Sequence, residues 1–349
     1  MLPRGIWMNQ QRAQGPTGVL LINTGSPSPP TPEAVRTYLG QFLMDDRIRP
    51  LPAPVWRAIL EHIILPRRCP ASAQKYAAIW GDKGSPLIAG CCELASQVET
   101  IIRSRGREGR SASATDVPLV RAAMTYGEPS VASVLKELKD AGCTQLIALP
   151  LYPQSAFATT AAALGALDRN LKQMAWQVPT ISIEAYGDNE AYLDAVADSI
   201  LQAGYRPQSD YLLLSLHAIP LPDIDAGDTY TEQVRRSSHA IAERLGAPSG
   251  AWSIAYQSPF EDGRRWTGPY TARVVTRLAK SDSRRLTVAC PGFAVDCLET
   301  LYDIDRILRA TYRDAQGNPA NDLLYVPCLN ASKSHAEVLA EIVLQAMNE

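Results

Sequence analysis

Short apolar runs alternate with longer amphipathic segments along this chain of 349 residues. The runs are continuous rather than alternating in polarity, and most of them end at turn residues. This pattern is typical of strands that are buried on both faces of a parallel sheet. Eight such strands are predicted, at 18–23, 117–126, 144–152, 180–186, 211–216, 252–257, 286–289 and 323–326.

The segments between the strands carry apolar residues at helical spacing. The first helix begins near Thr31, which can serve as its N-cap, with Pro32 as the first helical residue. The alternation of strand and helix predicts two similar Rossmann-like α/β domains, each with a parallel, doubly wound four-stranded sheet, and a cleft between them. Further helices are predicted at 56–65, 71–80, 86–105, 131–141, 159–174, 189–204, 230–245, 271–279 and 335–347, with an acid-rich helix inside 290–305.

The predicted domain boundaries follow from this order of elements. Residues 1–16 are expected to form a flexible leader, 17–187 the N-terminal domain with a pocket lip, 188–330 the C-terminal domain and 331–349 a closing helix. The segment 106–115 is polar and rich in Gly and Ser, which predicts a surface loop. Arg67 and Arg68 are placed at a helix end, where cations suit the dipole or could clamp the carboxylates of a ligand.

Composition excludes several classes of function. Hydrophobic residues make up 46% of the chain and charged residues 20%, and the net charge is -2. These values fit a globular chain with two cores and no basic surface for nucleic acid. No apolar run is long enough to cross a membrane. Seven cysteines without a C-x-x-C pair are typical of reduced thiols in the cytosol.

Candidate chemistry gathers at the carboxyl ends of the predicted strands, where open α/β sheets bind their ligands. His217 ends a buried strand, and a neutral imidazole there can take a proton near pH 7. Tyr126, Tyr152, Gln257 and the 290–305 segment lie at other strand ends. These residues are therefore the candidates for a site in the cleft.

Three acids in the 290–305 segment, Asp296, Glu299 and Asp303, are spaced i, i+3 and i+7. On a helix they would share one face, where their repulsion favours a bound cation or a retained proton. The other interpretation is a solvated first turn that the helix dipole favours. Combined with His217, the row of acids suits proton removal coupled to the handling of a divalent metal.

Other chemistries fit the sequence less well. The chain has no G-x-S-x-G motif, which argues against serine hydrolysis. Cys290 or Cys297 near His217 could act as a nucleophile, but the acids around Cys297 raise a thiol pKa. A closed zinc site would need four ligands, which the spacing of Cys and His does not supply. The apolar positions in 42–65 fit a core-facing helix, a pocket lip or a surface resting on a membrane.

From about Gly18 to Met347 the chain resembles the ferrochelatases, which insert ferrous iron into a porphyrin to make haem. The motifs that carry the resemblance follow in the family's order: GVLLINTGSP, SAQKYAAIWGDKGSPL, YGEPS, LPLYPQ, LLSLHAIP, WTGPYT and CPGFAVDCLETLYDI. The combination of LHAIP with FAVDCLETLY is highly specific. The Cys297 form of the last motif is similar to that of bacterial members that use protoporphyrin IX. The resemblance implies a chelatase-type fold.

The resemblance also implies roles for individual residues. His217 would accept protons from the pyrrole nitrogens, and Glu299 would relay protons or pass the metal. Asp303, one turn further along, would continue the acidic path, so these three residues are the expected contacts of the metal. A cleft that bends the macrocycle would expose its nitrogen lone pairs. The expected porphyrin-binding residues are Arg68, Tyr76, Ser85, Tyr126, Tyr152 and Trp266.

The chain departs from the family pattern at positions expected to face the pocket or its metal entrance. Thr24 replaces an apolar residue, Thr125 an Arg, Ser155 a Tyr, and Pro259 a Lys or Arg. One alternative is therefore a chelatase for another tetrapyrrole or metal, such as coproporphyrin III, cobalt or nickel. Another is a non-catalytic haem- or porphyrin-binding protein, although the intact His–Glu pair favours the enzyme.

The expected partners are a porphyrin and ferrous iron, with no nucleic acid, and we expect a monomer. Iron is a substrate here, so no resident cofactor is expected. The iron–sulfur members of the family use cysteines in a C-terminal tail, whereas the last cysteine here is Cys328, so no cluster is expected. A cytoplasmic location is expected, and peripheral contact with the inner face of a membrane through 42–65 is left open.

Overall fold

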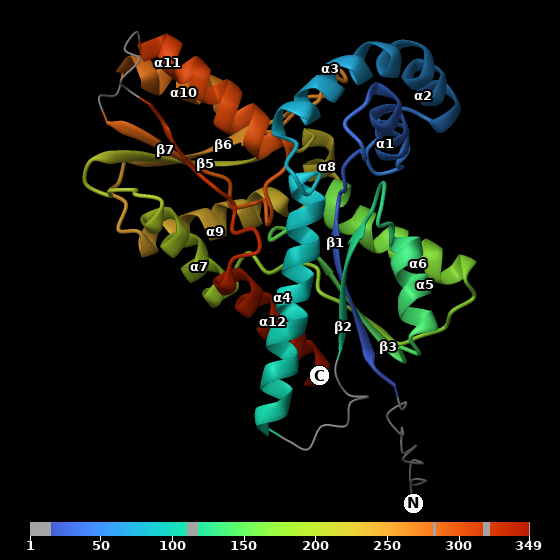
Figure 1. The fold of residues 1–349 in the computed structure, drawn as a ribbon. Coiled ribbons are helices and arrows are strands. Elements are labelled where there is room, and N and C mark those ends of the chain that lie inside the picture. Colours follow the sequence, from blue (N-terminus) through green and yellow to red (C-terminus); the bar gives the residue numbers. More distant parts are fainter. Residues whose placement is uncertain (1–14, 110–117, 282–283, 317–321, 349) are drawn as a thin grey trace, which may run out of the picture.

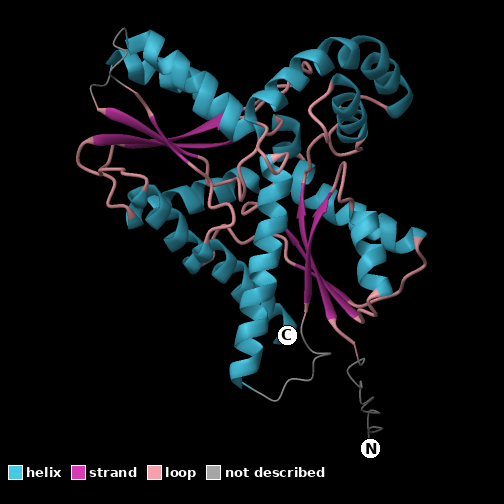
Figure 2. Cartoon of the chain, viewed as in Figure 1, coloured by secondary structure: helices cyan, strands magenta, loops and turns pink. Residues whose placement is uncertain are grey.

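The computed structural model describes residues 15–109, 118–281, 284–316 and 322–348. It contains two parallel four-stranded sheets, each flanked by helices (Figure 1, Figure 2). The predicted α/β architecture and the eight predicted strands are confirmed, while most of the predicted leader lies outside the described residues. The first sheet has the order β2-β1-β3-β4, with β1 (Thr17–Asn23), β2 (Leu119–Met124), β3 (Gln145–Pro150) and β4 (Thr180–Ser182). The second has the order β6-β5-β7-β8, with β5 (Asp210–His217), β6 (Trp252–Gln257), β7 (Arg285–Ala289) and β8 (Leu324–Val326).

The helices follow the strands as the hydrophobic pattern predicts. Helix α1 (Pro32–Met44) begins where expected, since Thr31 accepts a hydrogen bond from the Ala34 amide at 3.3 Å. The remaining helices of the first half are α4 (Pro86–Gly109), α5 (Val131–Asp140), the π-helix η3 (Phe157–Ala161) and α6 (Ala162–Gln173). Those of the second half are α7 (Glu190–Gln202), α8 (Leu221–Asp225), α9 (Tyr230–Arg244), α10 (Thr271–Ser281), the π-helix η4 (Leu298–Leu308), α11 (Arg309–Gln316) and α12 (Lys333–Asn348).

Two expectations about helix ends are wrong. The predicted helices 56–65 and 71–80 are one continuous stretch made of α2 (Ala53–Ile59), the π-helix η1 (Leu60–Ile64) and α3 (Leu65–Ile79). Arg67 and Arg68 therefore lie inside α3 and not at a helix end. The wider π-turn directly before Pro66 gives the proline ring room, and packing against α1 keeps the chain helical. Helix α4 also continues to Gly109, so the predicted surface loop begins too early; 110–117 lie outside the described residues.

The two halves share the largest of the hydrophobic core clusters. Strand β1 is buried along its whole length, as expected for a central parallel strand. The largest cluster of buried apolar residues includes side chains of α4, such as Leu94 and Val98, together with Leu339 and Val343 of α12. Helix α12 packs against α4, and in Figure 1 it crosses behind the lower half of α4. The closing helix α12 therefore also covers part of the hydrophobic core of the first half.

A charged pair anchors the start of β5. Asp210 is fully buried, and its carboxylate accepts hydrogen bonds from the guanidinium of Arg285 and from the Arg206 amide. The threonine hydroxyl of Thr287 on β7 lies 3.4 Å from the same carboxylate. These donors lower the pKa of Asp210 although burial alone would raise it. The network ties β5 to β7 at the edge opposite the carboxyl ends of the strands.

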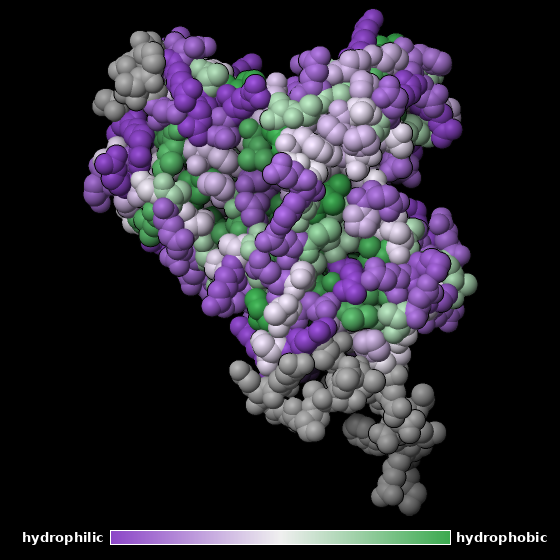
Figure 3. Space-filling view, viewed as in Figure 1, coloured by the Kyte–Doolittle hydropathy of each residue, from purple (hydrophilic) through white to green (hydrophobic). Residues whose placement is uncertain are grey.

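Apolar side chains are exposed in one notable place. On the face shown in Figure 3 the helices are mainly hydrophilic, with apolar residues in smaller patches. Among the described residues, Leu51, Val55 and Ile63 are 41%, 54% and 49% exposed, and all three belong to the segment that contains α2 and η1. No described helix is both long enough and apolar enough to cross a membrane.

Candidate active site

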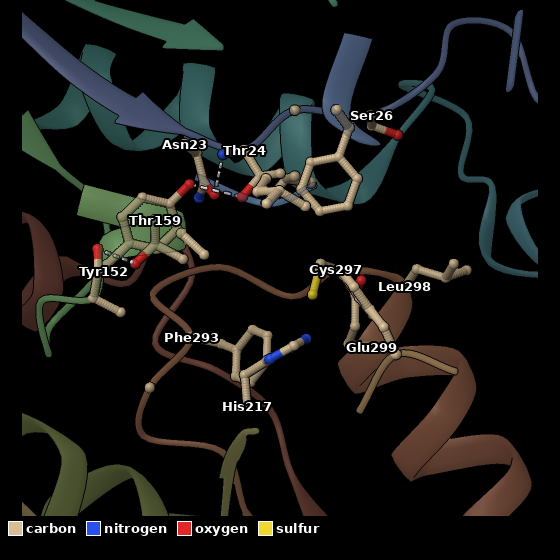
Figure 4. Close-up of a pocket in the computed structure, with 18 of the residues that line it drawn as sticks. Asn23, Thr24, Ser26, Tyr152, Thr159, His217, Phe293, Cys297, Leu298 and Glu299 are labelled. Carbon is tan, nitrogen blue, oxygen red and sulfur yellow. Dashed lines mark hydrogen bonds between the residues drawn. The ribbon is translucent and has the colours of Figure 1, made fainter. Parts of the chain in front are cut away.

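A cavity lies where the carboxyl ends of the central strands of both sheets meet. Thr24 follows β1, Tyr152 follows β3, and His217 ends β5, and all three line it. The space free of protein atoms, its open mouth included, is about 1540 Å³, which leaves room for a large ligand. Figure 4 shows Asn23, Thr24 and Tyr152 on one side and His217, Phe293 and Glu299 on the other. Both halves therefore contribute one wall, as strand topology predicts.

His217 is held as a base that faces this cavity. Its ring nitrogen Nδ1 lies 2.6 Å from the carbonyl oxygen of Ala218. Because a carbonyl only accepts, Nδ1 carries the hydrogen in the neutral ring, and Nε2 keeps its lone pair. Phe260 and Phe293 flank the imidazole at centroid distances of 6.1 and 6.4 Å. The tautomer and the ring orientation are thus fixed before any ligand arrives.

Gln257 connects His217 to the acidic helix. It is buried at the end of β6, directly beside His217 in the parallel register. Its amide nitrogen Nε2 donates to the carbonyl oxygen of Glu299 at 3.0 Å, while its Oε1 accepts from the Ser215 hydroxyl at 2.5 Å. One buried side chain therefore sets the position of the start of η4 relative to the end of β5.

The carboxylate of Glu299 acts on the titration of several side chains around the cavity. Burial raises the pKa of Tyr38, Tyr76 and Tyr152, and the charge of Glu299 adds to the shift at each of them. The pKa of the Cys297 thiol is also raised well above its ordinary value, first by burial and then by Glu299. The adjacent acid acts as expected on Cys297, but burial is the larger cause. Glu299 and Asp223 are the carboxylates of the lining, which also holds the guanidinium groups of Arg47, Arg68 and Arg264, so the charge of Glu299 favours a cation in its own neighbourhood.

The opposite wall carries a pair of hydroxyls. Thr24 Oγ1 lies 2.7 Å from the hydroxyl of Tyr152 (Figure 4). The Thr24 amide donates to Asn23 Oδ1 at 2.7 Å, and this places Thr24 directly after β1. Gly25 follows with a φ of +105°, and a Cβ there would lie only 1.9 Å from the Tyr126 carbonyl oxygen. The turn therefore needs glycine to bring the ends of β1 and β2 together.

Asp296 does not belong to the predicted row of acids, so that expectation is wrong. Helix η4 begins at Leu298, so Asp296 precedes the helix by two residues, and its side chain is buried. Its carboxylate accepts hydrogen bonds from Thr300 at 2.9 Å and from the Asn330 side chain at 2.8 Å, and also from the Tyr325 hydroxyl. The sequence places an acid before a helix, but spacing alone does not reveal that a buried network satisfies it.

Asp303 lies one turn beyond Glu299 on η4, but outside the cavity lining. Burial raises the pKa of Asp303, and the charge of Glu299 raises it further. Two contacts oppose this rise: the Lys75 ammonium lies 3.8 Å from the Asp303 carboxylate, and the Ser258 hydroxyl donates a hydrogen bond to it at 3.4 Å. Within the described ranges, no three His, Cys, Asp or Glu side chains are grouped closely enough to hold a metal ion. His217, Glu299 and Asp303 are thus not a preformed three-ligand site, and their metal-contacting role stays a prediction.

Most of the predicted porphyrin-binding residues line the cavity. The guanidinium of Arg68 lies 5.8 Å from the centre of the Phe260 ring, and Tyr76 packs edge-on against Tyr38. Tyr126 does not line it, because Phe42 packs against its ring at 5.2 Å. The predicted residues found in the lining are Arg68, Tyr76, Ser85, Tyr152 and Trp266.

The positions that depart from the family pattern are spread more widely than expected. Thr24 lines the cavity, as predicted. Thr125, Ser155 and Pro259 are absent from its lining. The backbone of Ser155 instead contacts the side chain of Gln233 on α9, with its amide 3.0 Å from Oε1. Only Thr24 is therefore placed to touch a bound ligand directly.

Sequence reasoning singled out neither Phe260 nor Arg264, and it included Phe293 only as part of the 290–305 segment. All three side chains line the cavity. Arg264 donates to the Ile48 carbonyl oxygen across the halves at 3.0 Å and pairs with Asp262 at 2.6 Å. The two phenylalanines follow the ends of β6 and β7, so the rule that located His217 would have found them. Arg264 lies in an irregular loop and gives no comparable signal.

Comparisons with known proteins agree with this geometry. A family model described as Ferrochelatase matches residues 16–347. The chain is 38% identical over 336 residues to the Ferrochelatase of Herminiimonas arsenicoxydans, covering 93% of this chain and 85% of the relative. It is 36% identical over 332 residues to that of Haemophilus influenzae (strain PittEE), covering 95% and 98%. The solved structure of SirB from Bacillus subtilis with Fe3+ has a similar fold, with a TM-score of 0.52, 13% identity and 95% of each chain covered.

Proposed function

The chain belongs to the ferrochelatase family, enzymes that insert a metal ion into a porphyrin, and we propose that it inserts Fe(II) into protoporphyrin IX to give protohaem. The proposal rests on the cavity described above, in which the imidazole of His217 and the carboxylate of Glu299 face a largely apolar, aromatic lining. Such a lining suits a flat, apolar macrocycle with a few polar substituents. Among the lining residues, Arg68 is the proposed partner of a propionate.

Insertion exchanges one dication for two protons, so the site must remove both protons while it admits the metal. A free-base porphyrin carries two pyrrole N–H groups, and the product carries none. We propose that Nε2 of His217 accepts these protons in turn. Glu299 attracts the incoming Fe(II) by its charge and relays protons or the metal along η4 toward Asp303. The charge on the macrocycle core is zero before and after the exchange.

A flat porphyrin directs its nitrogen lone pairs into its own plane, where an approaching metal cannot reach them. The cavity therefore favours insertion if it binds the macrocycle bent, because bending exposes the lone pairs and costs energy that binding supplies. The walls from β1 and β5 stand opposite each other and can press on both faces. Flat product haem fits such a cavity less well, which favours its release.

The single observation that carries the proposal is the fixed tautomer of His217. The 2.6 Å contact between Nδ1 and the Ala218 carbonyl leaves Nε2 as an acceptor on the cavity side. A proton acceptor held at the end of a buried strand, beside a carboxylate, is what the exchange of protons for a metal requires. A protein that only stored a metal-free porphyrin would have no need of that acceptor, whereas a haem-binding protein could use the same nitrogen as an iron ligand, so the insertion assay below separates these functions.

The test is anaerobic metal insertion followed by porphyrin absorbance. Fe(II), Co(II), Ni(II) and Zn(II) are offered to protoporphyrin IX and to coproporphyrin III, with wild type compared to His217→Ala and Glu299→Gln. We expect insertion into protoporphyrin to fall about a hundredfold or more in both variants. His62→Ala and Glu93→Gln are the matched controls, since both side chains are exposed and lie outside the cavity.

The other outcomes would correct the proposal in different ways. Faster insertion into coproporphyrin, or with Co(II) or Ni(II), would replace the substrate while keeping the roles of His217 and Glu299. Porphyrin binding without turnover of any metal would refute the enzymatic function altogether.

A further inference from the structure

One buried carboxylate serves the first turns of two helices that belong to different halves of the molecule. Oδ2 of Asp228 accepts a hydrogen bond from the Phe157 amide at 2.7 Å, and Oδ1 accepts one from the Tyr230 amide at 2.9 Å. Phe157 begins η3 in the first half, and Tyr230 begins α9 in the second. Asp228 is only 5% exposed. A single charged group thus connects the two walls of the protein.

Neither helix has a side-chain cap of its own. The N-cap residues, Ala156 for η3 and Thr229 for α9, make no side-chain capping hydrogen bond. The first amides of a helix lack partners within it and carry the positive end of its dipole, so a carboxylate there is strongly favoured. Asp228 meets this need at both helix starts at once.

Three neutral contacts accompany this charged one, the longest of them from Gln233 Nε2 to the Ser155 carbonyl oxygen at 3.4 Å. Gln154 Nε2 donates to the Ser237 hydroxyl at 3.0 Å, and the Ser155 amide donates to Gln233 Oε1 at 3.0 Å. Hydrogen bonds to an ionised acceptor are about twice as strong as neutral ones. Asp228 is therefore expected to be the main attachment at this junction.

Both helix starts also form part of the cavity. Ala156 and Thr159 line it from the side of η3, and Tyr230 lines it from the side of α9. Tyr230 is buried, which raises the pKa of its hydroxyl, and a backbone hydrogen bond with His217 opposes that shift. The spacing between the η3 wall and the wall that carries His217 thus depends on the group that holds both helix starts.

We propose that Asp228 is a positioning residue that holds these two walls at the spacing that bends the bound macrocycle. The inference rests on the proposed function, because it assigns to Asp228 the rigidity that distortion needs. A looser cavity would bind a flat porphyrin at least as well but would bend it less. Loss of the residue should therefore lower kcat without weakening binding.

The chain offers a variant that separates the two hydrogen bonds. In Asp228→Ser the short hydroxyl can still accept from the Tyr230 amide, as Ser does at helix starts, but it is too short to reach Phe157 as well. The matched control is Asn189→Ala. Asn189 caps α7 within the second half by accepting from the Tyr192 amide at 3.0 Å, so its loss removes a helix cap without touching the junction.

Three quantities are measured for each variant: kcat for metal insertion, the Kd of the metal-free porphyrin from quenching of tryptophan fluorescence, and the urea midpoint of unfolding. We expect Asp228→Ser to lower kcat about tenfold while the porphyrin Kd stays the same or falls. Resonance Raman lines of out-of-plane porphyrin modes, recorded without metal, should weaken in Asp228→Ser. Asn189→Ala should lower the urea midpoint by a comparable amount but keep the wild-type kcat and the wild-type Raman lines.

Asp228 has no positioning role if Asp228→Ser keeps the wild-type kcat and Raman lines, or if its porphyrin binding weakens in step with its stability. The same holds if the porphyrin bound to wild type is flat. Failure of the proposed function is a separate result: a wild type that inserts no metal refutes it, and the Raman comparison then decides on Asp228 alone.

Discussion

Replacing His335 by Asn should remove a large part of the acid sensitivity of this fold. His335 is completely buried near the start of α12, where its Nδ1 donates to the Asn330 carbonyl oxygen at 2.6 Å. Its other nitrogen, Nε2, is buried without a hydrogen-bond partner. Burial lowers the pKa of this imidazole to about 4, because a charged ring there would have no compensating group.

The sign and size of this pH dependence follow from the pKa of His335 in the unfolded and in the folded chain. The ordinary pKa of about 6.5 applies to the unfolded chain, so below that pH the unfolded chain binds a proton that the folded chain excludes. The contribution of the neutral His335 ring to the free energy of unfolding is complete above about pH 6.5 and is lost as the pH falls toward 4. With these two pKa values, the free energy of unfolding falls by about 2 kcal/mol between pH 7.5 and pH 5, with a limiting slope of about 1.4 kcal/mol per pH unit.

The assay is urea unfolding at several pH values between 7.5 and 5, followed by tryptophan fluorescence. In His335→Asn the side-chain amide can still donate to the Asn330 carbonyl but does not titrate. The free energy of unfolding of wild type minus that of the variant should therefore fall by about 2 kcal/mol between pH 7.5 and pH 5. His62→Asn is the control, because His62 is exposed on η1. If wild type and His335→Asn show parallel pH profiles, the buried imidazole is not the source of the acid sensitivity.

Three further predictions concern other buried groups. Asp210→Ala should lower the free energy of unfolding by about 2 kcal/mol in urea titrations, because the Arg206 amide and the Thr287 hydroxyl lose a buried acceptor and the one-third-exposed Arg285 loses its partner; a loss below about 0.5 kcal/mol would contradict this. An aromatic disulfide reagent at pH 8 should label Cys92 rapidly and spare Cys297, whose thiol burial keeps protonated, so Cys92→Ser should abolish the fast phase. A fast phase that persists in the double variant Cys92→Ser, Cys328→Ser, which also removes the half-buried thiol, would show that a buried thiol is reachable. Gln257→Leu should lower kcat about tenfold with little change in porphyrin Kd, because it releases the carbonyl of Glu299 from β6; equal loss of binding would indicate general damage instead.

The parts of the fold that depend on local pattern could be predicted from the sequence. Continuous apolar runs located the eight strands, and strand-end logic placed His217, Tyr152 and the start of η4 at one site. Thr31 and Pro32 marked a helix start because a cap is a contact between near neighbours. In each case the deciding interactions lie within a few residues or follow from the topology of parallel sheets.

The expectations that failed depended on contacts between distant segments. Asp296 looked like a member of an acidic face, but Tyr325 and Asn330 on a later part of the chain bind it. His335 is the first residue of the predicted helix 335–347, where nothing in the local pattern indicates burial, and the packing of α12 into the core buries it completely. Spacing along one helix carries no information about such partners. The monomeric state, the absence of a resident cofactor, the cytoplasmic location and the membrane contact through 42–65 remain predictions.

The packing of α12 on α4 has a consequence for how the chain matures during translation. The apolar side of α4 leaves the ribosome early, yet Leu339 and Val343, which share its core, are made long after it. All the elements from α4 to α12 must therefore be synthesised before the first half can complete its core. Nascent chains that stall before 333 would keep that side of α4 uncovered, a state prone to aggregation and attractive to chaperones.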